Sequence, residues 1–164
     1  MRNILKLIAV AFVTLALSTS CSKQKIAENI QSKIAIEGIE SISGSMADGW
    51  MVSLKVKNGT GYEPTLQVAE ADLLVDDLPT AHLSLMAPVT MEKRAYSTID
   101  IPVELKLTNQ LKAMSLLLRA RDKSLNNVHI TLTATIELMG IKKDIKLPKT
   151  PVGTLLKQLG YSLE

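Results

Sequence analysis

The clearest strand signal in the chain is the segment Trp50-Met51-Val52-Ser53-Leu54-Lys55-Val56-Lys57-Asn58. Its large apolar side chains occupy alternate positions from Trp50 to Val56, and serine and lysines stand between most of them. A period of two is typical of a β-strand with one buried and one solvated face. Because such a face needs a second apolar layer to cover it, the segment predicts a sheet packed in two layers.

The same alternation recurs along the chain. We expect further strands within residues 34–42, 66–75, 81–85, 89–91, 99–107, 128–138 and 141–147. Changes of parity at Gly38 and near Glu70 predict β-bulges. Pro102, on the outward parity of its strand, predicts an edge strand or the end of a ladder. The predicted fold is therefore all-β, an antiparallel β-sandwich of seven or eight strands.

Residues 108–121 break this rhythm and predict one inserted helix. Four apolar side chains recur there at helical spacing: Leu111, Met114, Leu117 and Leu118. Asn109 is a suitable N-cap, and the basic residues that follow suit the C-terminal end of the helix dipole. We expect this helix to cover an open end of the sandwich through its apolar face.

A second, short helix is predicted at the C-terminus. Thr150 is the expected N-cap, Pro151 the first helical residue and Gly160 the residue just past the end. Three leucines, Leu155, Leu156 and Leu159, are expected to dock it on the sandwich. The predicted organisation is a β-sandwich domain of residues 34–148 followed by a C-terminal helical segment of residues 149–164.

The first 20 residues have the pattern of a signal peptide. Arg2 and Lys6 precede an apolar run of 11 residues from Leu7 to Leu17. Such a run is too short to cross a hydrocarbon core of about 30 Å as a helix but suits a secretory signal. The chain is therefore predicted to be exported.

The only cysteine in the chain, Cys21, follows this run directly, after Leu17-Ser18-Thr19-Ser20. The arrangement resembles the lipobox of bacterial lipoproteins, although Ser18 stands where leucine is usual. The resemblance implies that the Cys21 thiol is acylated with fatty acids such as palmitate, that Cys21 becomes the new N-terminus, and that residues 21–33 form a lipidated tether. The alternative is a secreted protein cleaved after Ser20. Ser22 resembles the sorting residue of lipoproteins on the periplasmic face of the outer membrane.

Composition excludes several classes of partner. Without residues 1–20 the chain has 144 residues, 17 basic and 16 acidic, so its net charge is +1. This length is typical of one domain, and this balance does not favour binding to nucleic acid. Only four aromatic residues remain, Trp50, Tyr62, Tyr96 and Tyr161. Stacking platforms for bases or sugars need more exposed rings than that.

No set of residues in the sequence indicates catalysis. His82 and His129 fall on outward parities, and a metal site would need at least three converging ligands. The carboxylates Glu70, Asp72, Asp76 and Asp77 could bind calcium or simply form a solvated turn. The methionines Met86, Met91 and Met114 could line a soft apolar surface or fill the core. We therefore predict no catalytic, cofactor-binding or metal-binding residue, and no enzymatic activity.

The order of elements resembles a known family. An alternating strand ends in Val-x-Leu-x-Val-x-Asn at Asn58, a later strand reads Ile-x-Ile-Pro-Val-x-Leu from Ile99, and a helix and a closing hairpin follow. This is similar to the late embryogenesis abundant group 2 family, or water-stress and hypersensitive-response (WHy) domain, over residues 34–148. In that family proline commonly follows the asparagine, where this chain has Gly59. Membership would imply a fibronectin type III-like (immunoglobulin-like) β-sandwich without known catalysis.

Two functions follow as expectations. One is a membrane-anchored binding or structural module of the bacterial cell envelope, which meets a protein or lipid partner through a sandwich face or an edge strand. The other, implied by the resemblance, is a chaperone-like role in desiccation or osmotic stress, which sensitivity of a deletion mutant would reveal. A secreted periplasmic subunit of an envelope assembly is a further alternative.

Overall fold

The computed structural model describes residues 33–121 and 125–158. The predicted signal peptide, Cys21, nearly all of the predicted tether and Gly160 lie outside these residues. The described residues form eight strands and two helices. The strands are β1 (Ile34–Ser45), β2 (Gly49–Asn58), β3 (Thr65–Val75), β4 (Leu78–Leu85), β5 (Val89–Thr90), β6 (Ala95–Leu107), β7 (Val128–Leu138) and β8 (Ile141–Pro151). The helices are α3 (Gln110–Arg121) and α4 (Val152–Gln158).

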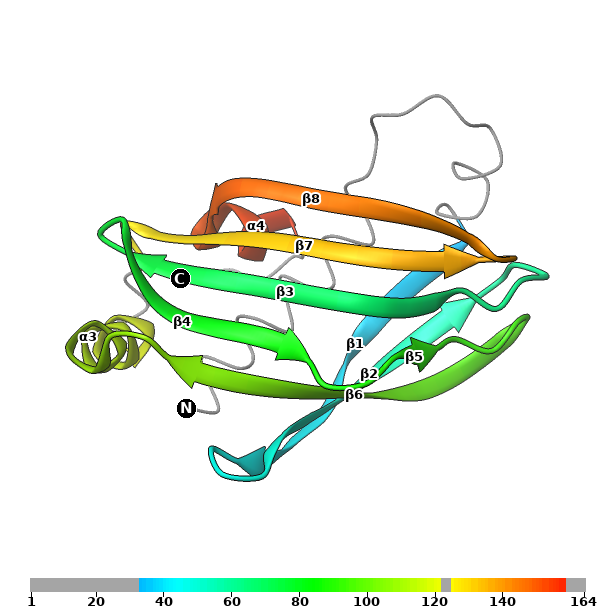
Figure 1. Ribbon diagram of the computed structural model, residues 1–164, viewed down its shortest axis with the longest axis horizontal. Coiled ribbons are helices and arrows are strands. Elements are labelled where there is room, and N and C mark those ends of the chain that lie inside the picture. The colour runs from blue at the N-terminus through cyan, green and yellow to red at the C-terminus, as the bar shows by residue number, and fades with distance from the viewer. Residues whose placement is uncertain (1–32, 122–124, 159–164) are drawn as a thin grey trace.

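All strand pairs are antiparallel, and the strand order is β1-β2-β6-β4-β3-β7-β8, with β5 paired to β3. The long strand β6 belongs to both layers. Its residues Ala95 to Val103 pair with β2, and its residues Val103 to Leu107 pair with β4. The sheet therefore folds over at β6, and β1 and β2 cross the layer of β3, β7 and β8 (Figure 1). This confirms the predicted all-β antiparallel sandwich with one inserted and one C-terminal helix.

The core lies between these two layers. From the first layer, Val52, Leu54 and Val56 are buried, and from the second so are Leu73 and Leu132. Burying side chains of this size contributes about 1.5–3 kcal/mol each. The alternation in residues 99–107 predicts an inward row on β6, and this is confirmed. Ile99, Ile101, Val103 and Leu105 are buried, and Leu107 at the end of the row is half-buried against the core.

The bulge predicted at Gly38 is confirmed, because the register against β2 shifts between Ile36 and Gly38. The bulge predicted near Glu70 is wrong in position. On the β7 side the register of β3 shifts between Leu66 and Val68 instead. Val68 is exposed, whereas Ala69 begins the buried parity, so the change of face comes earlier than the sequence suggested.

Pro102 does not lie in an edge strand, because β6 has neighbours on both sides. It lies where the ladder with β2 ends and the ladder with β4 begins. Of the two predicted alternatives, an edge strand or the end of a ladder, the structure thus shows the end of a ladder. The carbonyl of Pro102 accepts a hydrogen bond of 2.8 Å from the amide of Met86 at the end of β4. The backbone of Pro102 thus faces away from β2, and its missing N–H removes no bond from that ladder.

The N-cap predicted for α3 is confirmed, because the side-chain oxygen of Asn109 accepts a hydrogen bond of 3.1 Å from the amide of Lys112. The predicted buried face is wrong. Leu111, Met114 and Leu118 are 85%, 60% and 59% exposed, whereas Ala113 and Leu116 are 3% and 0% exposed. Only Leu117 of the four predicted residues packs against the core. The helix is rotated because the cations on its adjoining face bind the β3–β4 turn, as described below.

The predicted start of the C-terminal helix is also wrong. Thr150 pairs with Ile130 and Pro151 with His129, so β8 continues past residue 148 and α4 begins at Val152. The hydroxyl of Thr150 donates to the carbonyl of Pro148 at 2.7 Å instead of capping the helix. Of the three leucines expected to dock this helix, Leu155 is buried, and the side chains of Leu156 and Leu159 lie outside the described part of the chain.

Candidate functional site

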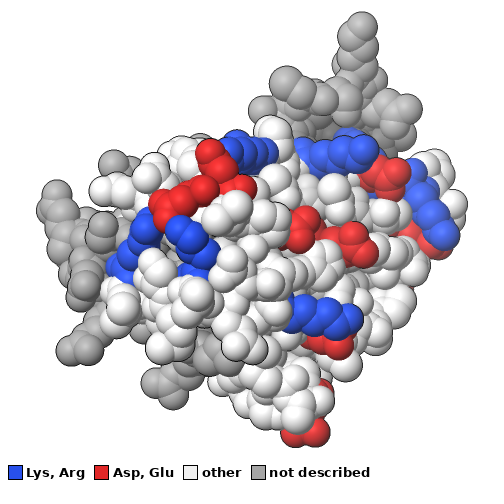
Figure 2. Space-filling model, turned by 60° about the vertical axis from the view of Figure 1, so that its left-hand side comes forward, with Lys and Arg blue, Asp and Glu red and all other residues white. Residues whose placement is uncertain are grey.

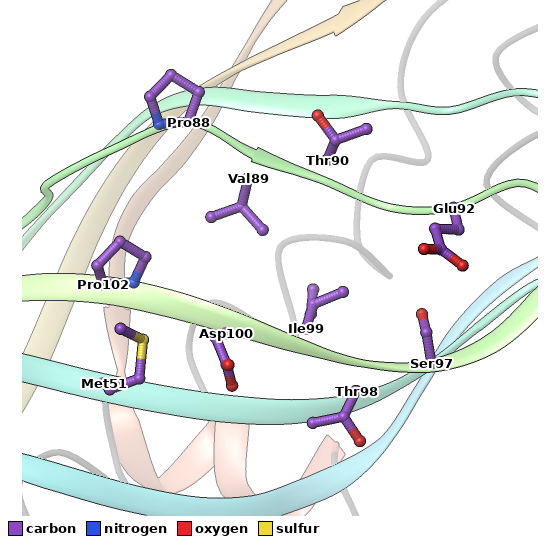
Figure 3. Close-up of a pocket in the computed structure, with 10 residues that line it drawn as sticks. All are labelled: Met51, Pro88, Val89, Thr90, Glu92, Ser97, Thr98, Ile99, Asp100 and Pro102. Atoms are coloured by element: carbon purple, nitrogen blue, oxygen red, sulfur yellow. The ribbon is translucent and has the colours of Figure 1, made fainter.

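A surface groove of about 380 Å³ lies between β5 and the first half of β6 (Figure 3). Its lining comes from the start of β2, from β5 with the residues beside it, and from β6. The lining residues are Met51, Pro88, Val89, Thr90, Glu92, Ser97, Thr98, Ile99, Asp100 and Pro102. Sequence patterns did not single out this groove, because β5 and β6 are brought together only by their pairing with other strands.

The edge of β6 that faces the groove is unpaired. The backbone N–H and C=O groups of successive residues in a strand point alternately to its two edges. Because the carbonyl of Pro102 points away from β2, the backbone groups of Thr98 and Asp100 also point away from β2. The groups of the intervening residues, such as Ile99, point toward β2. Within residues 33–121 and 125–158, no strand pairs with this edge of β6 before Val103. The strand therefore presents a row of free backbone donors and acceptors.

The edge of β5 that faces the groove is open as well. The amide of Met91 donates to the carbonyl of Pro64 at 3.0 Å, and Thr90 stands opposite Thr65 in the register. In an antiparallel ladder, pairs of opposite residues that are hydrogen-bonded to each other alternate with pairs that are not. Because Met91 and Pro64 form a bonded pair, Thr90 and Thr65 form a non-bonded pair, and the N–H and C=O of Thr90 point away from β3. The Thr90 hydroxyl lies 2.8 Å from that of Thr65. Among the described elements, β5 pairs with β3 alone.

The floor of the groove is apolar. Val89 and Ile99 point into the space between the two strands, and Pro88 and Pro102 lie at one end (Figure 3). Ile99 is buried and belongs to the core, so the floor is continuous with the rigid interior. An extended polypeptide would find apolar contacts below its side chains and backbone partners on both sides.

The charged lining residues are both carboxylates. Glu92 lies at the end of the groove, and Asp100 is held through a hydrogen bond of 2.6 Å from Ser53 on the neighbouring strand. The groove is lined by no lysine, arginine or histidine of the described residues. Its electrostatics therefore favour a segment that carries positive charge.

A buried polar network fixes the end of the groove at Glu92. The side-chain amide of Asn58 donates to the carbonyls of Glu92 and Tyr62, at 2.9 Å each. Its oxygen accepts hydrogen bonds from the amide and the hydroxyl of Thr60, at 3.0 and 2.6 Å. The network connects the β2–β3 loop to the β5–β6 loop, so Asn58, singled out by its place in the family pattern, acts as a structural support.

The residues weighed for chemistry do not converge. The Nδ1 atom of His82 lies 2.7 Å from a carboxylate oxygen of Asp72 on the solvated face, and His129 lies on a different strand, β7. In the described residues no three histidine, cysteine, aspartate or glutamate side chains could hold a metal ion. Met91 packs against the core, whereas Met86 and Met114 are exposed on different elements.

The acidic β3–β4 turn binds cations of the protein itself. Asp76 accepts a hydrogen bond of 2.7 Å from Lys112 and two from Arg119, at 3.2 and 3.0 Å. Asp77 forms an ion pair with Lys149 of β8. These hydrogen bonds lower the pKa of both carboxyl groups, that of Asp76 through Lys112 and then Arg119. Figure 2 turns this end forward and shows acidic and basic side chains side by side.

Cys21, the predicted lipidation site, lies outside the described residues. Within the part of the chain that the structure describes, neither helix has the length and apolar character needed to cross a bilayer.

Comparisons with known proteins assign no function. No family model and no curated protein matches the chain. Among solved structures, the chain is similar to a protein from Archaeoglobus fulgidus known from its crystal structure. The two share 14% identity over 69% of this chain and 94% of that chain, with a TM-score of 0.44.

Proposed function

We propose that the protein is a lipid-anchored, non-catalytic binding module of the bacterial cell envelope, which receives an extended segment of a partner protein in the groove between β5 and β6. The observation that carries the proposal is the pair of open strand edges, at Thr90 and at Thr98 and Asp100, that border one groove with an apolar floor. A partner strand placed there would bond to backbone groups that no strand of residues 33–121 or 125–158 pairs with.

The contrast with β8, one of the two outer strands of the sheet, supports this assignment. The last strand, β8, carries Lys142, Lys143, Lys146 and Lys149, and lysines on an edge oppose the addition of another strand. The open half of β6, residues 96–101, reads Tyr-Ser-Thr-Ile-Asp-Ile and has no lysine. One edge is thus protected against strand addition, and the edge beside the groove is not.

The chemistry of the groove defines the partner segment. An added strand would form main-chain hydrogen bonds with the open edges of β5 and β6. Every second side chain of that strand would contact the floor at Val89 and Ile99. The carboxylate of Glu92 favours a lysine or arginine at the end of that segment. We expect the partner to supply an extended stretch of alternating apolar and basic residues.

The envelope location and the anchor on Cys21 rest on the sequence. The apolar run that ends at Leu17 and the lone thiol at Cys21 support export and acylation. Two or more acyl chains hold a protein on a membrane far more firmly than one. The strand that ends at Asn58 supports membership in the late embryogenesis abundant group 2 family, which stays a prediction.

The binding experiment uses a matched pair of variants at one position. Thr98→Pro removes a backbone N–H that faces the groove, whereas Thr98→Ala keeps that N–H and removes the hydroxyl that donates to Glu40. A photo-crosslinking amino acid at Ser97 would report the partner in intact envelopes. We expect crosslinks that persist in Thr98→Ala and decrease at least about tenfold in Thr98→Pro, through lost backbone bonds.

The result that contradicts this function is equally specific. Crosslinking unaffected by Thr98→Pro would show that the contact does not use the strand edge. A probe at Thr133, on the solvated face of β7, serves as the control position. The anchor is tested separately by metabolic labelling with a fatty acid, which should be lost in Cys21→Ala.

A further inference from the structure

The turn between β7 and β8 exposes two large apolar side chains at a conformational cost. Met139 and Ile141 are 76% and 73% exposed on either side of Gly140. Met139 has φ 53° and Gly140 has φ 77°, so both central residues of this hairpin turn are left-handed. Glycine, asparagine and aspartate tolerate that conformation, whereas methionine does so at a cost.

The β3–β4 turn provides a comparison within the same molecule. Its central residues also have positive φ, 51° and 65°, but they are Asp76 and Asp77, which suit the conformation. Two turns with the same left-handed backbone thus have different side chains: aspartates in the β3–β4 turn, and an exposed methionine and isoleucine in and beside the β7–β8 turn. Folding alone does not explain the choice at Met139, since asparagine there would be less strained and more soluble.

Positive charge lies next to this apolar tip. Lys142 and Lys143 follow Ile141 directly and are exposed. Neither forms an ion pair with a carboxylate of residues 33–121 or 125–158. Glu137 stands opposite Lys142 in the register, but its carboxylate accepts a hydrogen bond of 3.0 Å from Gln67. An apolar tip beside free lysines suits a bilayer with anionic headgroups.

The chain enters the fold at the same end. The carbonyl of Lys33 accepts a hydrogen bond of 2.8 Å from Gly59, which begins the loop to β3. That loop leads to Thr65, and Thr65 pairs with Glu137 just before the tip. Figure 1 shows the start of β1 and the β7–β8 turn at one end of the sandwich and α3 at the other.

The length of the intervening chain agrees with this placement. Residues 22–33 lie between the predicted anchor and the fold, and even fully extended they span at most about 40 Å. The strands are themselves about 35 Å long, so the opposite end of the sandwich could stand on the bilayer only with residues 22–33 almost fully extended.

We infer that the β7–β8 turn is a second membrane contact, with Met139 and Ile141 in the headgroup region and Lys142 and Lys143 on anionic lipid phosphates. The inference takes its orientation from the proposed anchor on Cys21. The groove between β5 and β6 then lies on the flank of a sandwich that stands on the membrane, where it is open to a partner.

The experiment measures which end of the sandwich meets the lipid. In the acylated protein the Cys21 thiol is consumed, so Ile141→Cys offers a single site for an environment-sensitive fluorophore. The matched control is Leu111→Cys on α3, which is similarly exposed at the opposite end. The protein is placed in vesicles of phosphatidylethanolamine and phosphatidylglycerol that contain nitroxide-labelled lipid. We expect quenching at position 141 to be at least about threefold stronger than at position 111.

Equal quenching at the two positions, or stronger quenching at position 111, would overturn the inference, and the second result would assign the membrane contact to α3. Met139→Asn together with Ile141→Thr should lower quenching of a label at Lys142→Cys in a fold that remains intact. If Cys21 is not acylated in cells, the same labelled chain with Cys21→Ser is attached by an N-terminal histidine tag to a nickel-chelating lipid. Fatty-acid labelling thus tests the anchor alone, and the quenching pattern tests the tip alone.

Discussion

The side-chain oxygen of Asn58 lies 2.6 Å from the hydroxyl oxygen of Thr60, and both residues are almost completely buried. Two more bonds from the Asn58 amide, to Tyr62 and Glu92, use its remaining donors. An asparagine can donate twice and accept twice, and here all four positions are occupied. This one side chain therefore connects the two loops beside which the groove begins.

Asn58→Asp should destabilise the fold by about 2–4 kcal/mol, because the carboxylate oxygen in place of the amide nitrogen cannot donate to the carbonyls of Tyr62 and Glu92 and would face them with negative charge. Urea unfolding at neutral pH measures this as a lower transition midpoint. Asn126→Ala, at an exposed asparagine, is the control and should change stability by less than about 0.5 kcal/mol. Equal effects of the two substitutions would contradict the structural role of Asn58.

Acid should weaken the attachment of α3 to the β3–β4 turn. The pKa of Asp76 is lowered in the folded state by hydrogen bonds from Lys112 and Arg119, so the ionised carboxylate favours folding. That contribution is present above the unfolded pKa of about 3.9 and is lost as the pH falls through the lower folded value. The difference in unfolding free energy between the native protein and Asp76→Asn should be constant near neutral pH and shrink below about pH 4. A difference that grows on acidification would contradict this.

Replacement of the strained residue in the β7–β8 turn should stabilise the protein. Met139→Asn keeps the positive φ of 53° with a residue that tolerates it, so we expect a gain of about 0.5–1 kcal/mol. Thermal unfolding checks this as a higher Tm. Gly140→Ala is the opposite case, because a side chain at φ 77° adds strain and should lower the Tm. A lower Tm for Met139→Asn would show that the turn needs its methionine for folding.

Two leucines on α3 should contribute very different amounts to stability. Leu116→Ala removes a side chain that is 0% exposed and should cost about 2–5 kcal/mol, whereas Leu111→Ala removes one that is 85% exposed and should cost less than about 0.5 kcal/mol. Chemical denaturation of the two variants provides the measurement. A large loss from Leu111→Ala would restore the helix face that the sequence pattern predicted.

Proline substitutions at adjacent positions of β6 should test the open edge. Ser97→Pro removes an N–H that points toward β2 and so breaks a ladder bond, whereas Thr98→Pro removes one that points into the groove and should cost clearly less stability. Circular dichroism and urea unfolding distinguish the two variants. Similar losses would mean that both edges of this strand carry bonds within the fold.

Local patterns predicted the strands well and the helix face poorly. The alternation in Trp50–Asn58 and in residues 99–107 identified buried rows correctly, because in a strand the choice of face depends only on parity. On α3 the spacing of Leu111, Met114 and Leu118 is that of a buried stripe. The helix instead turns Leu116 inward, because Lys112 and Arg119 bind Asp76, which is far away in the sequence.

The sequence by itself determined the alternating strands, the N-cap at Asn109 and the turn at Asp76 and Asp77, since each depends on residues close together in the chain. The signal peptide before Cys21 stays a prediction. Only the tertiary structure decided the strand order, the buried network of Asn58 and the groove beside β6. A strand edge is open or closed according to which distant segments pair with it, and side-chain periodicity does not contain that information.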